Sequence, residues 1–204
     1  MASVEGLEMY AAITSGAPGW QKRAFERYRG LVYSLLIKSL GPSAELPDLM
    51  SDVFVTFFES AGRIRSASAV KSYLISITMN LARAELRRKR RRGTVVTLTN
   101  ARAEVDLYGL DDPKANAALI QLARILDELD EDERVAFVLH GLEDMPVHEI
   151  AAVLKVSLST AKRRVQRANE HVLKRVSRNA LLADYVRDPP AERPRRKSGM
   201  RFKS

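Results

Sequence analysis

A basic segment near the carboxyl end of the chain has the side chains that proteins use to read DNA. One side of the helix expected there carries cationic and amide groups: Lys162, Arg163, Arg164, Gln166 and Arg167. Arginine and glutamine pair with base edges in the major groove, while lysine and arginine also bind phosphates. Thr160, close to the start of this helix, suits a phosphate contact. The segment therefore predicts a helix that contacts duplex DNA.

A short helix before this segment completes a helix-turn-helix pattern. Pro146 suits the first turn of a helix, and Ile150 and Leu154 give that helix an apolar face. Ser157 with Thr160 caps the longer helix that follows. In such a unit the second helix enters the major groove. A plain helical hairpin with a solvated basic face is the alternative.

A second basic segment, residues 83–92, has seven basic side chains and one acid. The net charge of the whole chain is +9, although residues 101–149 carry thirteen acids and only four bases. Two basic helices separated by an acidic body predict two nucleic-acid contacts on one chain. The basic tail, residues 187–203, predicts either a salt-sensitive attraction to DNA or a dispensable terminus.

Catalysis, metals and cofactors are not expected. The chain has no cysteine, which excludes disulfides, cysteine-ligated zinc and thiol catalysis. His140, His148 and His171 lack the spacing of metal ligands, and the sequence has neither a glycine-rich phosphate loop nor a nucleophile motif. The acids from Asp127 to Glu133 suit helix capping and solvation better than metal binding.

The chain also lacks the signals of export and membrane insertion. It does not open on a basic start followed by an apolar stretch, so we expect no signal peptide. No apolar run approaches the roughly 18 residues that cross a bilayer. We therefore expect an intracellular, cytoplasmic protein with no membrane insertion.

Helices should position both basic segments. Apolar residues recur every three or four positions from Gly19 to Leu40, from Pro47 to about Ser60, and from Ser68 into the arginine run. These three helices can enclose one core of about ninety residues. The segment Gly62–Ala69, between the second and third helices, is expected to be a loop.

The second half of the chain predicts a separate set of helices. Helical pattern resumes at Lys114, Asp130 with Glu133 forms a capping-box-like pair, and Gly141 is expected to end the helix that this pair opens. The expected fold is all-α, with two small helical domains. Their ranges are 1–92 and 114–182, with a flexible linker at 93–113 and a basic, disordered tail at 183–204.

Two ordered groups of motifs resemble the sigma-70 family, and within it the extracytoplasmic-function (ECF) sigma factors. The first group contains SAELPDLMSDVFVTFF, from Ser43, and YLISITMNLARAELRRKRRR, from Tyr73. The second is LDEDERVAFVLHGLEDMPVHEIAAVLKVSLSTAKRRVQRA, from Leu129. The resemblance covers roughly residues 20–92 and 118–178, in the family's order.

The resemblance implies a role for each surface. The first domain would dock on the clamp helices of the largest subunit of core RNA polymerase, through Asp48, Leu49 and Asp52. It would also hold the melted minus-ten element of promoter DNA, through Arg63, Arg65, Tyr73, Asn80, Arg83, Arg87, Arg88 and Arg90. The helix-turn-helix would read the minus-thirty-five element beside the polymerase flap, through Thr160, Lys162, Arg163, Arg164, Gln166 and Arg167. An anti-sigma factor in a bacterial cytoplasm is a further implied partner.

The chain departs from the family pattern at several of these positions. Pro47 replaces an acid and Ser51 replaces the common glutamine, beside the expected polymerase contacts. Glu85 replaces aspartate. Lys155 occupies a turn position where the family commonly has glycine, so a left-handed backbone there would carry a modest cost.

Two other function classes remain open from the sequence alone. A helix-turn-helix regulator would bind duplex DNA without engaging polymerase, and its first domain would serve dimerisation or effector binding. A sigma-like co-regulator would keep polymerase binding without directing initiation. The segments SDVFVTFF and YLISITMN favour a sigma factor over a bare regulator, because the latter has no need of such a first domain.

Overall fold

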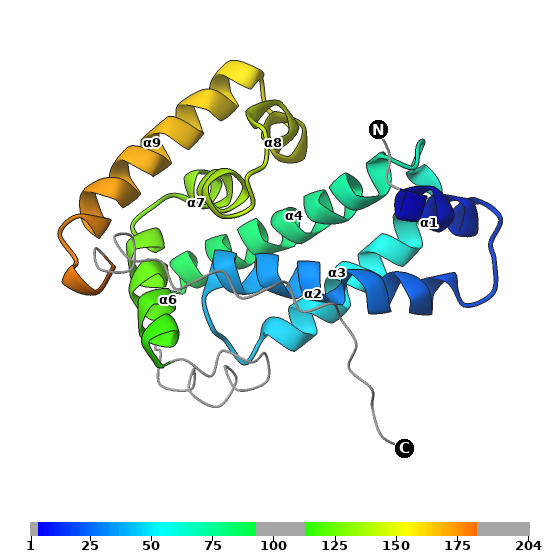
Figure 1. Ribbon diagram of the computed structural model, residues 1–204, viewed down its shortest axis with the longest axis horizontal. Helices are drawn as coiled ribbons and strands as arrows, with labels where there is room; N and C mark the ends of the chain where they lie inside the picture. The colour runs from blue at the N-terminus through cyan, green and yellow to red at the C-terminus, as the bar shows by residue number, and fades with distance from the viewer. Residues whose placement is uncertain (1–3, 93–112, 183–204) are drawn as a thin grey trace.

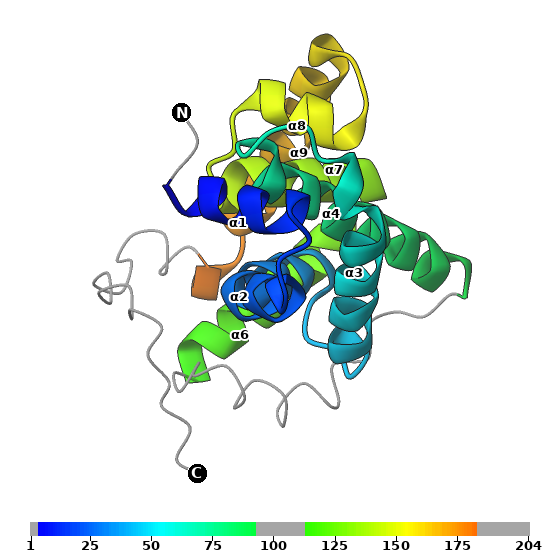
Figure 2. The same cartoon turned by 90° about the vertical axis from the view of Figure 1, so that its right-hand side faces the viewer.

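The computed structural model describes residues 4–92 and 113–182, which are helical with short turns and contain no β-strand. The linker expected at 93–113 and the tail expected at 183–204 lie outside these residues, except that Pro113 begins a helix. The all-α fold class predicted from the sequence is confirmed. Figures 1 and 2 show the long helix α4 between the α2–α3 pair and the α7–α8 pair.

The first four α-helices form one core. They are α1 (Val4–Thr14), α2 (Trp20–Leu40), α3 (Leu46–Ser60) and α4 (Ala69–Arg91), with a single 3-10 turn, η1 (Ala61–Arg63), after α3. Trp20, Phe57 and Phe58 form an aromatic cluster, in which the ring centroids of Trp20 and Phe58 are 5.4 Å apart and edge-on. Such pairs add stability beyond the area they bury, and they fix α2 against α3.

The helices of this first group begin and end close to the predicted residues. Pro47 lies in the first turn of α3, where its missing N–H costs nothing. Gly41 ends α2 with φ of 75°, and its N–H donates to the carbonyl of Ile37 at 2.9 Å. The sequence interpretation did not include α1, whose Met9 is buried in the same core.

The second half contains α6 (Pro113–Leu126), α7 (Glu131–Phe137), a π-helical turn η4 (Val138–Leu142), α8 (Val147–Leu154) and α9 (Leu158–Val176). Asp130 caps α7 as predicted, since its side chain accepts a hydrogen bond from the N–H of Glu133 at 2.7 Å. The prediction that Gly141 ends this helix is wrong: the helical backbone passes through Gly141 to Leu142. A Cβ atom at Gly141 would lie 3.2 Å from the ring of Phe137, so a glycine here allows this ring to pack closely against the backbone.

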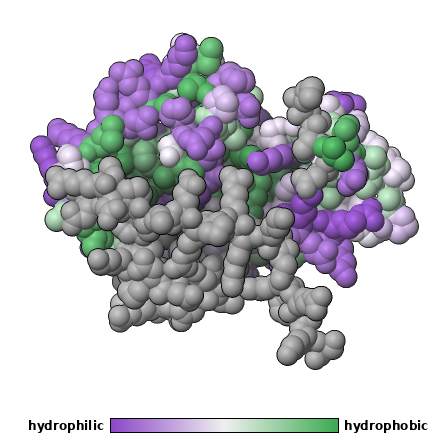
Figure 3. Space-filling model, viewed as in Figure 1, coloured by the Kyte–Doolittle hydropathy of each residue, from purple (hydrophilic) through white to green (hydrophobic). Residues whose placement is uncertain are grey.

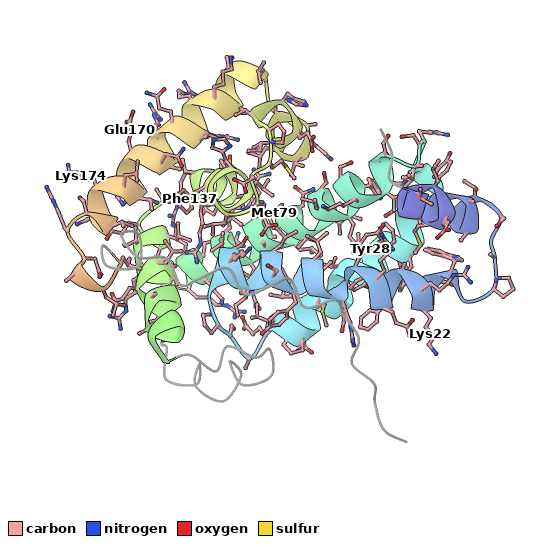
Figure 4. The ribbon with its side chains drawn as sticks, in the orientation of Figure 1. Lys22, Tyr28, Met79, Phe137, Glu170 and Lys174 are labelled. Carbon is pink, nitrogen blue, oxygen red and sulfur yellow. The ribbon has the colours of Figure 1, made fainter. Side chains whose placement is uncertain are left out.

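The two halves share part of their apolar core. Leu35 of α2 and Ile75 and Met79 of α4 belong to the same buried cluster as residues of α6 to α9. Helix α4 contacts both α7 and α8, and Met79 and Phe137 lie near the centre of Figure 4. The sequence predicted two domains but not this packing of one against the other.

Candidate nucleic-acid and polymerase interface

Helices α8 and α9 form a helix-turn-helix whose geometry follows from its sequence. Ile150 and Leu154 of α8 and Val165 of α9 are buried in one core, and the small Ala161 is fully buried at the crossing. Ser157 begins α9 by accepting a hydrogen bond from the N–H of Thr160 at 3.2 Å. Because this core fixes which side of α9 faces inward, the opposite side is presented to solvent.

The turn between α8 and α9 contains the left-handed residue that the sequence predicted. Lys155 has φ of 54° and ψ of 46°, the region that glycine enters at least cost. Its N–H donates to the carbonyl of Ala152 at 3.3 Å and closes α8. The departure from glycine at this position therefore leaves the turn geometry in place.

The outer side of α9 is cationic and open. Lys162, Arg163, Gln166 and Arg167 are all exposed, at the spacing of one helix face. In Figure 3 the surface at the upper left, where α9 lies, is mostly hydrophilic with apolar patches between. The amide Nε2 of Gln166 donates to Oε1 of Glu170 at 2.9 Å, which orients the amide along the helix. This face has the shape and the donors that the major groove accepts.

Two other predicted residues of α9 lie differently. Thr160 is half-buried, and its hydroxyl is 2.9 Å from that of Ser157. Arg164 turns away from the cationic face, and its Nη2 is 2.5 Å from Oδ2 of Asp132 in α7. The structure therefore brings four of the six predicted residues together on one face and directs Arg164 towards the neighbouring helix.

The residues predicted to hold single-stranded DNA lie on η1, on the loop after it, and on α4. Arg63 and Arg65 are exposed on either side of the buried Ile64, which anchors the loop in the first core. Tyr73 and Asn80 are half-buried on α4. Together these side chains supply cationic groups and an aromatic ring, the kinds of group that bind unstacked bases.

The arginines at the carboxyl end of α4 differ in what they contact. Arg87 is exposed, whereas Nε of Arg88 donates to Oε2 of the buried Glu85 at 2.7 Å. This hydrogen bond, together with the charge of Glu85 and a weaker pair with Glu45, raises the pKa of Arg88 above its usual value. Arg88 therefore neutralises a buried acid.

Arg83 and Arg90 contact the second half of the chain. Arg83 forms an ion pair with Asp132, and Nη1 of Arg90 is 3.1 Å from Oε1 of Glu131. Nη2 of Arg90 also donates to the carbonyl of Leu129 at 2.9 Å. Both guanidinium groups thus contact residues at, or just before, the start of α7.

The outer side of α3 has the character of a protein-docking surface. Asp48 and Asp52 are exposed one helical turn apart, while Leu49 is half-buried against the first core. Val55 continues the exposed stripe and is 53% exposed. An apolar side chain flanked by carboxylates suits a partner surface that combines apolar and basic groups.

Comparison with known families shows which family the two halves of the chain resemble. Residues 24–92 match the family model of Sigma-70 region 2, and residues 119–172 match that of Sigma-70, region 4. The two matches together span more than half of the chain and contain both candidate DNA surfaces.

The chain belongs to the sigma-70 family.

Curated relatives refine this assignment. The ECF RNA polymerase sigma-E factor of Escherichia coli (strain K12) is 27% identical over 155 residues, which cover 72% of this chain and 81% of the relative. The RNA polymerase sigma-H factor of Pseudomonas aeruginosa is 25% identical over 164 residues, covering 74% of this chain and 85% of the relative. The ECF resemblance inferred from the motifs is confirmed, and the chain is an RNA polymerase sigma factor.

Solved structures with the same fold include two protein complexes. CnrH in complex with the cytosolic domain of CnrY gives a TM-score of 0.62 at 20% identity, covering 86% of this chain and 99% of that chain. The sigma factor RpoE in complex with the anti-sigma factor NepR from Bartonella quintana gives 0.58 at 21% identity, covering 76% and 96%. These likenesses establish the fold of this sigma factor.

Sequence reasoning missed two exposed apolar residues of this sigma factor. Leu158, the first residue of α9, is 46% exposed beside the cationic face, where an apolar side chain can meet a thymine methyl group. Val55 on α3 is the other. Both occupy a helix position that the core does not use, and that position was the available signal.

Other kinds of site find no support in the described part of this sigma factor. Among residues 4–92 and 113–182, no group of three or more histidines or acids is placed to hold a metal ion. None of the described helices is both long and apolar enough to cross a membrane.

Proposed function

We propose that this sigma factor divides promoter recognition between its two helical groups. Residues 1–92 act as the region-2 domain and residues 114–182 as the region-4 domain, with 93–113 between them. The exposed face of α9, with Lys162, Arg163, Gln166 and Arg167, reads the minus-thirty-five element in duplex form. This assignment is supported by the exposure and common orientation of these side chains on a helix whose opposite side is buried.

The minus-ten element is assigned to η1 and α4. Arg63 and Arg65 meet the backbone of the melted strand, Tyr73 and Asn80 flank an extruded base, and Arg87 follows the phosphates. Arg83 and Arg90 join this set once their acidic partners are released. The exposure of Arg63 and Arg65 and the partial exposure of Tyr73 support the assignment.

Core RNA polymerase docks on α3 in this account. Asp48, Asp52 and Val55 contact the clamp helices of the largest subunit, while region 4 lies beside the flap. An anti-sigma factor is a further partner, and it covers these faces when the factor is inactive. The relation in fold to two sigma proteins solved in complexes, one of them with a named anti-sigma factor, supports this partner.

The observation that carries the proposal is the co-occurrence of both sigma-70 regions in one chain with an exposed cationic face on the helix-turn-helix. Bacterial core polymerase mixed with this protein should elute as one complex and should make promoter thymines reactive to permanganate. A protein that binds duplex DNA alone but neither co-elutes nor opens DNA would be the stand-alone regulator. One that co-elutes without opening any DNA would be the co-regulator.

A further inference from the structure

The first turn of α7 lies between two helices that are assigned to DNA. One oxygen of the Asp132 carboxylate contacts Arg83 of α4, and the other is 2.5 Å from Nη2 of Arg164 of α9. A single carboxylate thus joins an arginine of region 2 to an arginine of region 4. Each arginine contacts one oxygen of the carboxylate, and hydrogen bonds between ionised groups of this kind are stronger than those between neutral groups.

Neighbouring contacts extend this link along the boundary between the halves. Glu131 pairs with Arg90 at 3.1 Å, and the carbonyl of Leu129 accepts a hydrogen bond from the same guanidinium at 2.9 Å. Further along, Oε1 of Glu143 is 2.5 Å from Nζ of Lys38 of α2. In all of these pairs the acid comes from the acidic second half of the chain.

An apolar contact lies beneath the ion pairs. Leu35, Ile75 and Met79 of the first half pack in the core of the second, and α4 contacts α7 and α8 directly. Ion pairs at the edge of an apolar contact set the orientation of the two surfaces more than they add free energy. The paired acids therefore select one arrangement of the two halves.

The ion pairs at this boundary are incompletely satisfied. The side chains of Arg83 and Arg164 are only 16% and 23% exposed, yet Nε of Arg83 and Nη1 of Arg164 are buried without a hydrogen-bond partner. Taking charged groups out of water is costly unless all their donors are paired. An anion that satisfied these unpaired donors would compete with the acids for the two arginines.

Phosphate is the anion that these arginines are assigned to bind. A guanidinium that donates to a carboxylate uses the same N–H groups that it would offer to a phosphate. While Glu131 and Asp132 hold Arg83, Arg90 and Arg164, the N–H groups engaged in those pairs are not offered to DNA. The acids thus take the place of nucleic-acid phosphates within the chain.

We propose that Glu131 and Asp132 form an acidic latch that keeps the free protein closed and weakens its binding to DNA. Opening separates α7 from α4 and returns Arg83 and Arg90 to the DNA surface of α4. The link to DNA rests on the proposed function, whereas the closed arrangement rests on the contacts alone.

The test removes the latch charges without changing side-chain shape. Glu131→Gln with Asp132→Asn is compared with Glu26→Gln with Glu59→Gln, which removes two exposed acids from α2 and α3 and changes the net charge equally. Binding of the free protein to a fluorescent DNA duplex is measured by anisotropy at low salt. We expect the latch variant to bind about tenfold more tightly than the control, since several partly buried ion pairs are released together.

A second variant and a distance measurement keep the result independent of any local effect of α7. Glu143→Gln breaks the pair with Lys38 and touches none of the residues assigned to DNA, and it should also increase affinity. Because the chain has no cysteine, Lys22→Cys and Lys174→Cys accept a donor and an acceptor dye at two sites only. These exposed positions lie on α2 and α9, at opposite ends of the molecule (Figure 4).

The distribution of distances between the two dyes should be narrow in the otherwise unchanged protein. It should broaden both in the Glu131→Gln, Asp132→Asn variant and in Glu143→Gln. Equal DNA affinity of the latch variant and its control would overturn the proposal, as would an unchanged distance distribution. Failure of the proposed function has a different signature: the unaltered protein would not support promoter-directed transcription with polymerase, while both latch measurements could still be read.

Discussion

Replacing Arg163 by alanine tests whether α9 reads bases. Arg163 is exposed on the outer face, so in the major groove it can pair with the two acceptors of a guanine. Losing such a contact costs about 1–3 kcal/mol, a factor of roughly 5 to 150 in affinity for the preferred base. The loss should disappear when that base pair is changed, because the alanine variant no longer distinguishes it.

Gln166 should give a smaller effect for a reason that the structure supplies. Its amide donates to Glu170 at 2.9 Å, and that hydrogen bond must be exchanged before the amide can pair with a base. The exchange offsets about 1 kcal/mol of the contact, so Gln166→Ala should cost at most about 2 kcal/mol. In a Glu170→Ala background the amide is already released, and the cost of losing Gln166 should increase.

The assay is competition binding of the polymerase complex to promoters carrying each base substitution in the upstream element. Lys174→Ala is the matched control, since it removes one exposed positive charge further along the same helix. The control should weaken binding to all sequences about equally. If Arg163→Ala and Gln166→Ala also weakened all promoters equally, the assignment of base reading to this face would be refuted.

Three further predictions concern the turn, the docking surface and the arginine run. Lys155→Gly should stabilise the protein by up to about 1 kcal/mol, because glycine adopts the left-handed backbone conformation without strain, although it also raises the entropy of the unfolded chain. Thermal unfolding measures this, and a Lys155→Ala variant more stable than Lys155→Gly would contradict it. Val55→Asp should abolish co-elution with core polymerase and leave duplex binding by the free protein unchanged, whereas loss of both would indicate misfolding. Arg88→Ala should lower the midpoint of thermal unfolding more than Arg87→Ala, because it leaves the buried Glu85 unpaired, and Arg87→Ala should have the greater effect on DNA binding; the reverse order would show that Arg88 serves DNA instead.

The helices could be predicted because their patterns are local. The apolar stripes of α2, α3 and α4, the capping residues Asp130 and Ser157, and the left-handed turn at Lys155 each depend on neighbours within a few positions. Helix α1 was missed because its short apolar stretch shows little periodicity and its burial depends on packing against α2 and α4.

The direction of the basic side chains could be predicted only in part. Lys162, Arg163, Gln166 and Arg167 follow the helix face that the core leaves open, so the sequence placed them correctly on one surface. Arg164 lies at the edge of that face, and its turn towards Asp132 depends on where α7 packs. The ion pairs of Arg83 and Arg90 likewise depend on contacts between residues about forty positions or more apart, which no periodicity encodes.

Transcription from a pool of random promoter fragments, by bacterial core polymerase with and without this protein, tests the central claim most directly. The account predicts run-off transcripts that appear only with the protein and share two elements at a fixed spacing. Identical transcripts in both reactions would contradict the assignment of promoter recognition to this chain.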